Sequence, residues 1–559
     1  MHVDPVEFEI FKNVLISIAE EMGVTLCRTA FSPNIKERLD YSCAVYDADG
    51  NTIAQGDHMP VHLGAMPLSV RAAIQSCQLA PGDMVVLNDP FEGGTHLPDI
   101  TLVSAVYLGR HAKPAFYVAN RAHHSDVGGM SPGSMPLASE LFQEGLIIPP
   151  VTLVRRNRVV EDVLRFILSN VRTPDEREGD LTAQIAANRV AELRLREVVA
   201  KYGRRKVERY AAAVQDYTER IVRRTIGELP DGEYSYDDAL DDDGLNGQPV
   251  WIRVRIRING EDAEVDFTGS DPETKGNVNA NFAISLSATL YAFRCLVPQD
   301  VPYNAGVSRA VRVVAPEGLI VNARRPAAVA GGNVETSQRI TDVVLGALAQ
   351  AVPERVPAAS QGTMNNVTLG GIDPRSGRRF AYYETIGGGM GGRNGAAGLS
   401  GVHTHMSNTR NTPVEAIEQY LPVRIRQYRL RDGSGGRGRY PGGDGIIREY
   451  EMLCDTDVTI LSDRRRKPPY GACGGQDGAC GQNVLIRDGV EEKLPGKVQL
   501  RLRPGDRLRI ETPGGGGYGS DSANPDLPGL LLVPPVTTRR PRRERQLHGH
   551  RFGRDALRA

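Results

Sequence analysis

The sequence predicts a mixed α/β (α+β) protein: a large, multi-lobed subunit with β-hairpins, buried helices and a disordered C-terminal tail. Two hydrophobic patterns support this class. Apolar residues recur at helical spacing in some segments and alternate with polar residues in others. The chain has 559 residues, of which 40% are hydrophobic and 24% charged, so it has a globular composition and room for several domains.

The first half of the chain predicts helices and short antiparallel strands. Residues 7–26 place apolar side chains at helical spacing and predict an opening helix. Residues 43–54 predict a hairpin around an Asp-Gly turn. The runs 101–108 and 115–119 are rich in strand formers and predict an antiparallel pair. Residues 181–228, rich in Ala, Arg and Glu, predict a long helical segment.

The second half predicts strands around two buried helices. Residues 250–267 alternate apolar and polar side chains about an Asn-Gly turn and predict a hairpin. Residues 281–296 and 336–351 predict buried helices, and residues 446–512 alternate β-like runs with turns. We expect an N-terminal metal-site region (1–230), a C-terminal α/β region with Gly-rich loops (231–519) and a disordered basic tail (520–559).

Composition narrows the classes of partner. The net charge of −1 gives no electrostatic case for nucleic acid or an anionic membrane. No apolar run approaches the roughly 18 to 20 residues of a membrane helix, and the N-terminus lacks the features of a signal peptide. The seven cysteines are scattered without a C-x-x-C pair, which argues against a disulfide framework or a zinc knuckle. We therefore expect a cytoplasmic protein without a nucleic-acid or membrane partner.

Three of the 11 histidines, His96, His123 and His124, lie close together in the sequence, each near a carboxylate and glycines. Imidazole and carboxylate are ligands that Zn, Mn and Fe accept. The predicted strand pair would bring residues 96–99 next to residues 120–126. His96, Asp99 and His123 are therefore candidate metal ligands. Their spacing alone also fits a turn-capping His96 and hydrogen-bonded core histidines.

Two further residues are candidates for catalysis. Glu384 precedes a glycine run and is a candidate general base or water-orienting group; the alternative is a structural carboxylate that accepts backbone N–H bonds. His124 is a candidate for a group that orients the ligands. His58 and His62 lie four residues apart and could form a second ligand pair on a helix, but Pro60 between them favours a loop with a structural or substrate-channel role. The chain contains no G-x-x-x-x-G-K-[ST] phosphate loop, so ATP, if used, is expected to bind elsewhere.

A set of short motifs follows in one order between about residues 4 and 519. Besides the two histidine clusters, these motifs cover residues 34–43, 58–66, 132–136, 179–184, 331–338, 383–389 and 512–517. In them the sequence resembles the hydantoinase B/oxoprolinase family. This family includes the B subunits of ATP-dependent hydantoinases and lactamases, and is related to subunits of acetone and acetophenone carboxylases.

The resemblance implies a large α/β subunit that works in a hetero-oligomer with a hydantoinase A-like, ATP-binding subunit. On that partner, ATP with Mg would phosphorylate the amide or ketone oxygen of the substrate. The resemblance also implies Asp40, His96, Asp99 and His123 as the ligands of a divalent transition metal. Asp40 enters through the resemblance alone.

We therefore expect the B subunit of an ATP-dependent hydrolase of cyclic amides, such as a hydantoin, 5-oxoproline or a lactam. A metal-bound water would attack the substrate that the partner has phosphorylated and break its C–N bond. One alternative is a subunit of an ATP-dependent ketone carboxylase, in which an activated enolate attacks CO₂. A second alternative is a non-catalytic scaffold of the same fold, which the presence of all four ligand types disfavours.

Overall fold

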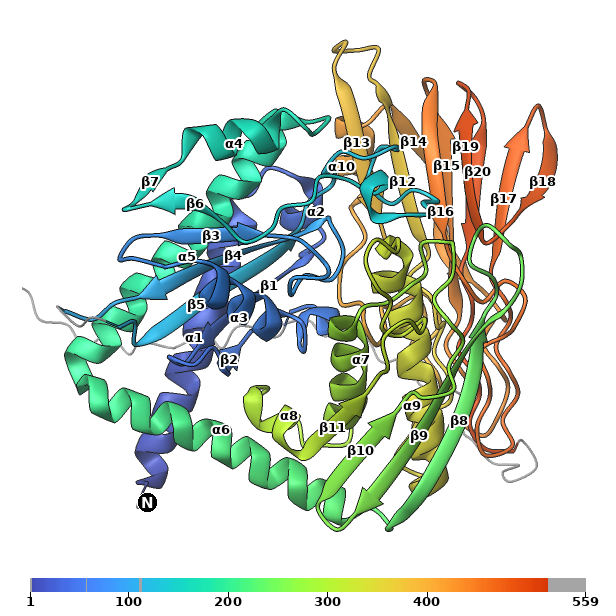
Figure 1. Cartoon of the computed structure of the whole chain (residues 1–559). Coiled ribbons are helices and arrows are strands. Elements are labelled where there is room, and N and C mark those ends of the chain that lie inside the picture. Colours follow the sequence, from blue (N-terminus) through green and yellow to red (C-terminus); the bar gives the residue numbers. More distant parts are fainter. Residues whose placement is uncertain (1–2, 57, 110–112, 521–559) are drawn as a thin grey trace, which may run out of the picture. The chain divides into compact units, whose positions relative to one another are not determined.

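The computed structural model describes residues 3–56, 58–109 and 113–520, which form helices and four β-sheets (Figure 1). The predicted mixed α/β class is confirmed. Apart from Ser520, the tail that we predicted to be disordered lies outside the described residues. The predicted boundary near residue 230 falls between a helix and a strand, and it stays a prediction.

A seven-stranded antiparallel sheet with the order β2-β1-β5-β4-β3-β6-β7 dominates the N-terminal half. The predicted hairpins over residues 43–54 and 101–119 are both part of it. Its strands are β1 (Tyr41–Tyr46), β2 (Thr52–Gln55), β3 (Met84–Leu87), β4 (Asp99–Val106), β5 (Phe116–His123), β6 (Val151–Arg155) and β7 (Arg158–Val159).

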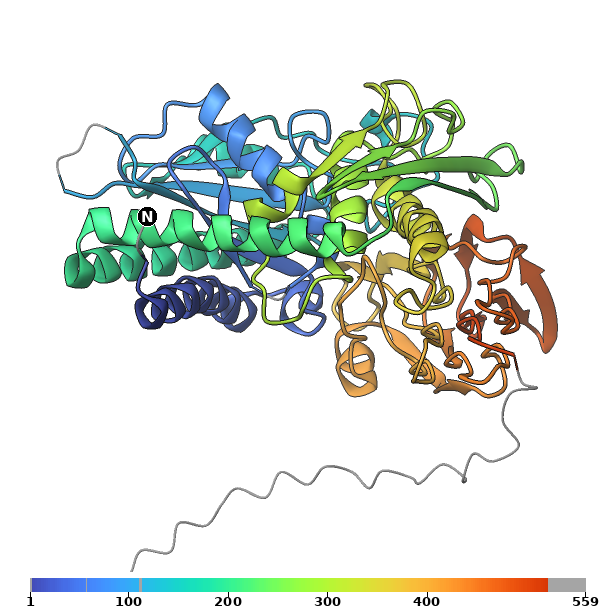
Figure 2. The ribbon, with the colours of Figure 1, turned by 90° about the horizontal axis from the view of Figure 1, so that it is seen from below.

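Helices cover both faces of this sheet, so its central strands are buried throughout. Successive strand residues point to opposite faces. In β1, Cys43 and Val45 pack with helices α1 (Pro5–Thr29) and α5 (Pro174–Tyr202), whereas Ala44 and Tyr46 pack with α3 (Met66–Ser76). Figure 2 shows α1 and α5 in one helical layer with α6 (Arg204–Gly227).

The predicted helical segment over residues 181–228 is two helices rather than one. Helix α5 ends at Tyr202 and α6 begins at Arg204. Gly203 between them has a φ of 83°, in the left-handed region where a side chain would be strained. The hydrophobic pattern continues across this glycine, and for that reason it did not mark the break.

The C-terminal half contains three smaller sheets. The predicted hairpin over residues 250–267 is confirmed, with β9 and β10 joined in antiparallel register. The sheet orders are β11-β10-β9-β8, β13-β12-β16-β19 and β14-β15-β20-β17-β18. The strands are β8 (Gly232–Leu240), β9 (Val250–Asn259), β10 (Asp262–Asp266), β11 (Val311–Val314), β12 (Asn366–Ile372), β13 (Arg379–Glu384), β14 (Val423–Arg431), β15 (Gly445–Met452), β16 (Thr456–Leu461), β17 (Gln482–Arg487), β18 (Val490–Leu494), β19 (Lys497–Leu502) and β20 (Arg507–Glu511).

The two predicted buried helices are confirmed as α7 (Phe282–Arg294) and α9 (Ser337–Ala351). A π-helical turn, η3 (Gly332–Thr336), leads directly into α9. None of the helices in the described ranges is both long enough and apolar enough to span a bilayer. The shorter helices are α2 (Pro33–Lys36), η1 (Pro60–His62), η2 (Leu141–Gln143), α4 (Glu161–Leu168), α8 (Ala305–Ala310) and α10 (Val414–Tyr420).

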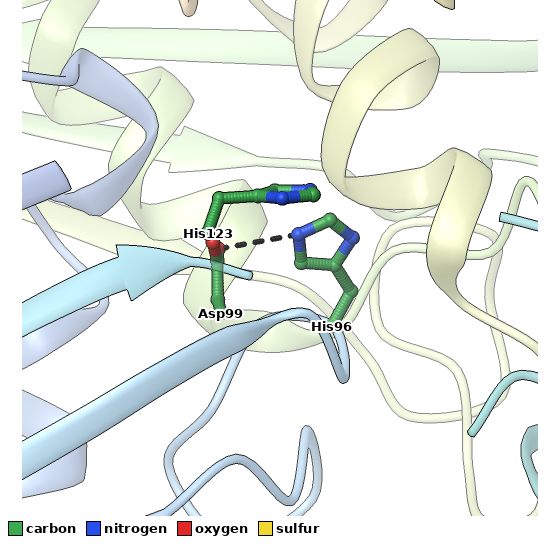
Figure 3. A group of neighbouring side chains, drawn as sticks. All are labelled: His96, Asp99 and His123. Atoms are coloured by element: carbon green, nitrogen blue, oxygen red, sulfur yellow. Dashed lines mark ion pairs between the residues drawn. The ribbon is translucent and has the colours of Figure 1, made fainter. Parts of the chain in front are cut away.

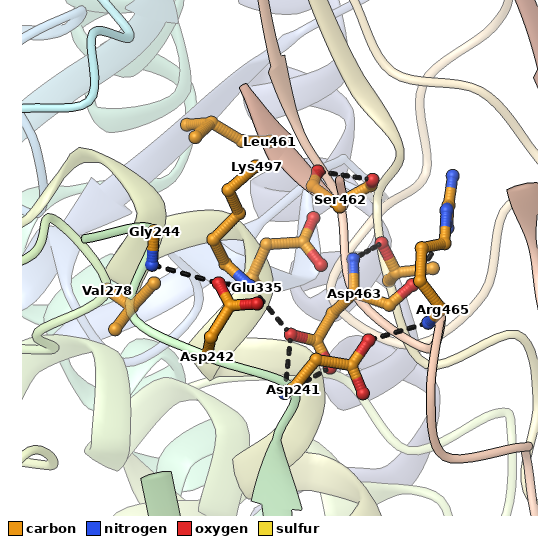
Figure 4. A network of polar contacts seen from close by, with 12 residues as sticks. Asp241, Asp242, Gly244, Val278, Glu335, Leu461, Ser462, Asp463, Arg465 and Lys497 are labelled. Carbon is orange, nitrogen blue, oxygen red and sulfur yellow. Dashed lines mark hydrogen bonds and ion pairs between the residues drawn. The ribbon is translucent and has the colours of Figure 1, made fainter. Parts of the chain in front are cut away.

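A buried ionic network joins the ends of strands from different sheets (Figure 4). Lys497 at the start of β19 donates to Asp463 (2.9 Å) and lies 3.7 Å from Asp242. Asp463 also accepts the backbone N–H of Asp241, which follows β8. The carboxylate of Asp241 accepts the backbone N–H of Arg465 at 2.6 Å. Because each buried carboxylate has a donor, the network fixes these strand ends relative to one another.

Glu144 is a second buried carboxyl group, and it supports the segment before η3. Its Oε1 accepts the backbone N–H groups of Val329 (2.9 Å) and Ala330 (2.8 Å). Burial raises the pKa of Glu144 to about 8, although the two backbone donors favour the charged form. The unfolded chain therefore ionises this carboxyl at a lower pH than the folded chain does.

We predict that Glu144 makes the wild type lose stability as the pH rises from about 5 to 8. Below this range both states hold the proton; within it only the unfolded state releases it. Glu144→Gln keeps the acceptor oxygen without the ionisation, so its melting temperature should rise relative to wild type across the same range. The exposed Glu161→Gln serves as control, and a Glu144→Gln difference that does not vary with pH would contradict the prediction.

Candidate metal centre

The β4–β5 hairpin carries the candidate ligands at one end. Asp99 opens β4, His123 closes β5, and their Cα atoms are directly paired. His96 lies in the turn before β4, where its carbonyl accepts the Asp99 N–H at 3.2 Å. One donor atom from each of His96, Asp99 and His123 lies within 4.8 Å of the other two, and all three residues are buried. Figure 3 shows the three side chains converging. The structure therefore brings together three of the four predicted ligands.

Unsatisfied polar atoms mark the centre of this cluster. His96 Nδ1 and Nε2, Asp99 Oδ1 and His123 Nε2 are buried and find no hydrogen-bond partner among the described residues. A buried polar atom without a partner is costly, and native proteins rarely keep one without a reason. Two imidazoles and a carboxylate form a donor set that a divalent transition metal accepts. The residues present thus fit the predicted ion.

The contacts that position the Asp99 carboxylate are all made by one of its oxygens, Oδ2. Thr95 Oγ1 donates to Asp99 Oδ2 at 2.7 Å, and two imidazole nitrogens lie near the same oxygen, His62 Nε2 at 3.3 Å and His96 Nε2 at 3.4 Å. Burial disfavours the charge, but the neighbouring His96 and His62 outweigh it and keep the pKa of Asp99 well below its usual value. His62 is itself oriented by Ser42 Oγ, 2.8 Å from its Nδ1. Asp99 therefore stays an ionised ligand candidate with its Oδ1 free.

Two contacts orient the imidazole of His123, one at a ring nitrogen and one on the face of the ring. The Asn34 side-chain amide donates to the His123 carbonyl oxygen (2.6 Å), and its nitrogen lies 3.0 Å from His123 Nδ1. The ring of Tyr383 stacks on the imidazole, with centroids 4.4 Å apart and an angle of 9° between the planes. Burial, together with the charge of nearby His96, lowers the pKa of His123 far below its usual value. The ring is therefore neutral, as a metal ligand must be.

Asp40, the fourth predicted ligand, is near the cluster but outside the group of three. It precedes β1, and its carbonyl accepts the His123 N–H at 3.0 Å. Its carboxylate lies 3.9 Å from the buried Arg38 guanidinium. Burial raises the pKa of Asp40 to about 7; Arg38 opposes this shift and the charge of Asp99 adds to it. Its role as a ligand stays a prediction.

His124 points away from the cluster. Its Nε2 lies 3.0 Å from Gln184 Oε1 on α5, and burial lowers its pKa to about 4. This placement follows from strand geometry, because neighbouring residues at the end of β5 face opposite sides of the sheet. His124 contacts the helix that covers the hairpin rather than the candidate ligands. Its predicted catalytic role remains untested.

Glu384, at the end of β13, is buried and fully hydrogen-bonded. Its Oε1 accepts from Asn411 (2.9 Å) and from the backbone of Thr412 (3.1 Å), and its Oε2 accepts from Arg448 (2.9 Å) and Tyr450 (2.5 Å). Burial alone would raise the pKa of Glu384, but Arg448 and its other donors lower it. These contacts favour the structural alternative, although the predicted role as a general base has not been tested.

Three further residues support the cluster, and the sequence analysis singled out only one of them. His62, for which a structural or substrate-channel role is predicted, lies in η1 and contacts Asp99. Asn34 and Tyr383 were not singled out, although they lie in the motifs at residues 34–43 and 383–389. Membership of those motifs was the only signal available for them.

A family model described as Hydantoinase B/oxoprolinase matches residues 4–521. The chain belongs to this family. It is 44% identical to an uncharacterised protein of Methanocaldococcus jannaschii over 93% of this chain and 91% of that protein. It is 41% identical to 5-oxoprolinase 1 of Arabidopsis thaliana and 32% identical to a putative D-/L-hydantoinase B subunit of a Pseudomonas strain. Both matches cover 93% of this chain, with 42% of the Arabidopsis protein and 90% of the Pseudomonas protein.

Two solved structures share the fold. The ATP-dependent caprolactamase from Pseudomonas jessenii has a TM-score of 0.86 at 29% identity, covering 93% of this chain and 92% of that chain. A nucleotide-free acetone carboxylase has a TM-score of 0.85 at 17% identity, covering 92% of this chain and 76% of that chain. The second likeness shows the fold alone.

We predict that the purified chain carries about one divalent transition metal ion, bound through His96, Asp99 and His123. Elemental analysis of wild type and His96→Ala should show metal in the first and its loss in the second. His405→Ala removes another buried histidine and should retain the metal. Equal metal content in wild type and His96→Ala would contradict the proposed metal site.

Proposed function

We propose that this chain is the B-type subunit of an ATP-dependent hydrolase that opens cyclic amides such as hydantoins, 5-oxoproline or lactams. The observation that carries this proposal is the buried His96–Asp99–His123 cluster with its unpartnered donor atoms. Support comes from the names of its relatives, a 5-oxoprolinase, a hydantoinase subunit and a caprolactamase. These relatives supply the amide-hydrolysing context that the geometry alone does not specify.

We further propose that ATP binds to a separate, hydantoinase A-like subunit. The chain has no phosphate loop. It spans about 42% of the Arabidopsis 5-oxoprolinase but 90% of the Pseudomonas hydantoinase protein. This difference is consistent with a second functional part that is fused in one relative and separate in the other. The partner would phosphorylate the substrate, which makes the ring carbon more electrophilic.

In this proposal the residues of the chain hold and orient the centre. A bound divalent ion would lower the pKa of a water molecule toward neutrality and so supply the nucleophile. His96 and His123 would provide ring nitrogens, and Asp99 would provide Oδ1, the oxygen that Thr95 and His62 do not contact. The burial of all three residues limits competing solvent around the reacting carbon.

The alternative of a carboxylase subunit gains little from the likeness to acetone carboxylase, because that likeness shows a shared fold and not a shared reaction. The non-catalytic scaffold is disfavoured because three candidate ligands converge and each has a buried side-chain N or O atom without a hydrogen-bond partner among the described residues. Amide hydrolysis therefore remains the function that we propose.

The proposed division of labour predicts that the isolated chain neither binds Mg-ATP appreciably nor hydrolyses a lactam. Titration calorimetry with Mg-ATP should show no binding at micromolar concentrations, and activity should require the neighbouring A-like subunit. Measuring each subunit alone and then both together supplies the control. Micromolar affinity for ATP in this chain alone would overturn the assignment of nucleotide to the partner.

Asp99→Asn should separate phosphorylation from ring opening in the reconstituted complex. The neutral amide weakens the metal site, so product formation should be lost, while substrate-dependent consumption of ATP should continue in part as the activated species decays in water. Excess metal should restore some product formation. Asp49→Asn, in an exposed turn, is the matched control. If product formation and ATP consumption stop together with the metal still bound, the ion serves activation or assembly instead.

A further inference from the structure

Tyr383 lies against a candidate ligand although it comes from a different sheet. Its ring stacks on His123 with centroids 4.4 Å apart and nearly parallel planes. The guanidinium of Arg38 lies over the same ring, 5.0 Å from its centroid, and donates to the Tyr383 carbonyl at 2.7 Å. Tyr383 is fully buried. The Tyr383 ring therefore contacts both Arg38 and His123, and its stacking restricts the plane of the imidazole.

The hydroxyl of Tyr383 is anchored in a single orientation. It donates to Asn366 Oδ1 at 2.9 Å. The Asn366 amide nitrogen donates to Glu335 Oε1 and to the Leu461 carbonyl, both at 2.7 Å. Turning this amide over would place its NH₂ against the hydroxyl hydrogen and its oxygen against two acceptors. The Tyr383 hydroxyl is consequently fixed as a donor.

Glu335, at the end of this chain of hydrogen bonds, lies in the π-helical turn η3. Such turns occur often at functional sites because the extra residue redirects a side chain. Glu335 Oε1 also accepts the Met364 N–H at 3.0 Å. Figure 4 shows its carboxyl group beside Lys497 and the carboxylates of the ionic network. The anchor of Tyr383 is thus tied to a carboxyl group that lies beside the buried ionic network.

The neighbouring Tyr382 shows what an ordinary core tyrosine does on the same strand. It points to the other face of β13, packs in a hydrophobic cluster with Val458 and Ile460, and donates to Thr412 Oγ1 at 2.8 Å. Both tyrosines are buried and both hydroxyls are bonded. Only Tyr383 places its ring flat on a residue with an unpartnered ligand atom.

We propose that Tyr383 is a positioning residue for the metal centre: its ring fixes the plane of His123, and Asn366 and Glu335 fix its ring. The inference rests on the proposed metal site and extends it to residues that touch neither metal nor substrate. Groups that orient a ligand typically contribute about 10- to 100-fold to metal affinity. An imidazole free to rotate would lose this contribution.

The test is metal affinity in the full-length chain, with Zn²⁺ measured by competition against a chromophoric chelator. Tyr383→Leu removes the stacked ring and should weaken Zn²⁺ binding by about 10- to 100-fold. Tyr383→Phe keeps the ring without its anchor and should weaken binding by about threefold, as expected for one lost hydrogen bond. Tyr382→Leu removes an equally buried ring and should bind Zn²⁺ as wild type does.

The visible spectrum of the Co²⁺-loaded protein gives a second readout, because loss of packing elsewhere in the protein would not change it. It should change for Tyr383→Leu and remain unchanged for Tyr382→Leu. Wild-type affinity in Tyr383→Leu, or an equal loss in both Leu variants, would overturn the inference while the metal site stands. If Tyr383→Leu does not fold, wild-type affinity in Tyr383→Phe overturns it instead. Failure of the wild type to bind Zn²⁺ would refute the proposed metal centre itself.

Discussion

The register of β4 against β5 is the constraint on which the candidate centre depends. Directly opposed residues in an antiparallel pair place their side chains on the same face, and Asp99 opposes His123. A slip of one residue would turn one of them to the other face. Burial of both strands along their whole length prevents this slip, since the two faces pack against different helices. The packing of α3 and α5 thus protects the position of the ligands.

Buried charge is the second constraint. The buried charged side chains are contacted by polar groups that are distant in the sequence. Asp40 and Asp99 are buried carboxyl groups, while Arg38 and Arg121 are buried guanidinium groups nearby. Arg121 donates to Ser69 (2.7 Å) and Thr101 (2.9 Å), and it reaches Asp99 only through Thr95. No single ion pair neutralises Asp99. The Thr95 hydroxyl and the imidazoles of His62 and His96 all contact Oδ2 of Asp99, which leaves its Oδ1 without a hydrogen-bond partner among the described residues.

Local sequence signals were sufficient for the hairpin and for the clustering of three candidate ligands, because strand alternation, turn residues and nearby histidines all lie within a short stretch. They failed where the decisive contact is distant. The contact between Asn34 and His123 spans 89 positions, and Tyr383 comes from another sheet. His62 was set aside because Pro60 argued against a helix, yet a single 3-10 turn still directs it to Asp99. Periodicity cannot report such pairings.

The distant contacts also explain why the family motifs are scattered along the chain. The motifs at residues 34–43 and 58–66 supply Asn34 and His62, and those at residues 331–338 and 383–389 supply Glu335 and Tyr383. The support for the centre therefore comes from both sides of the predicted boundary near residue 230. A chain ending there would keep the three ligands but lose the ring on His123 and the acceptors of Arg38 at Tyr383 and Thr385. The candidate centre thus depends on the C-terminal half for contacts that orient His123.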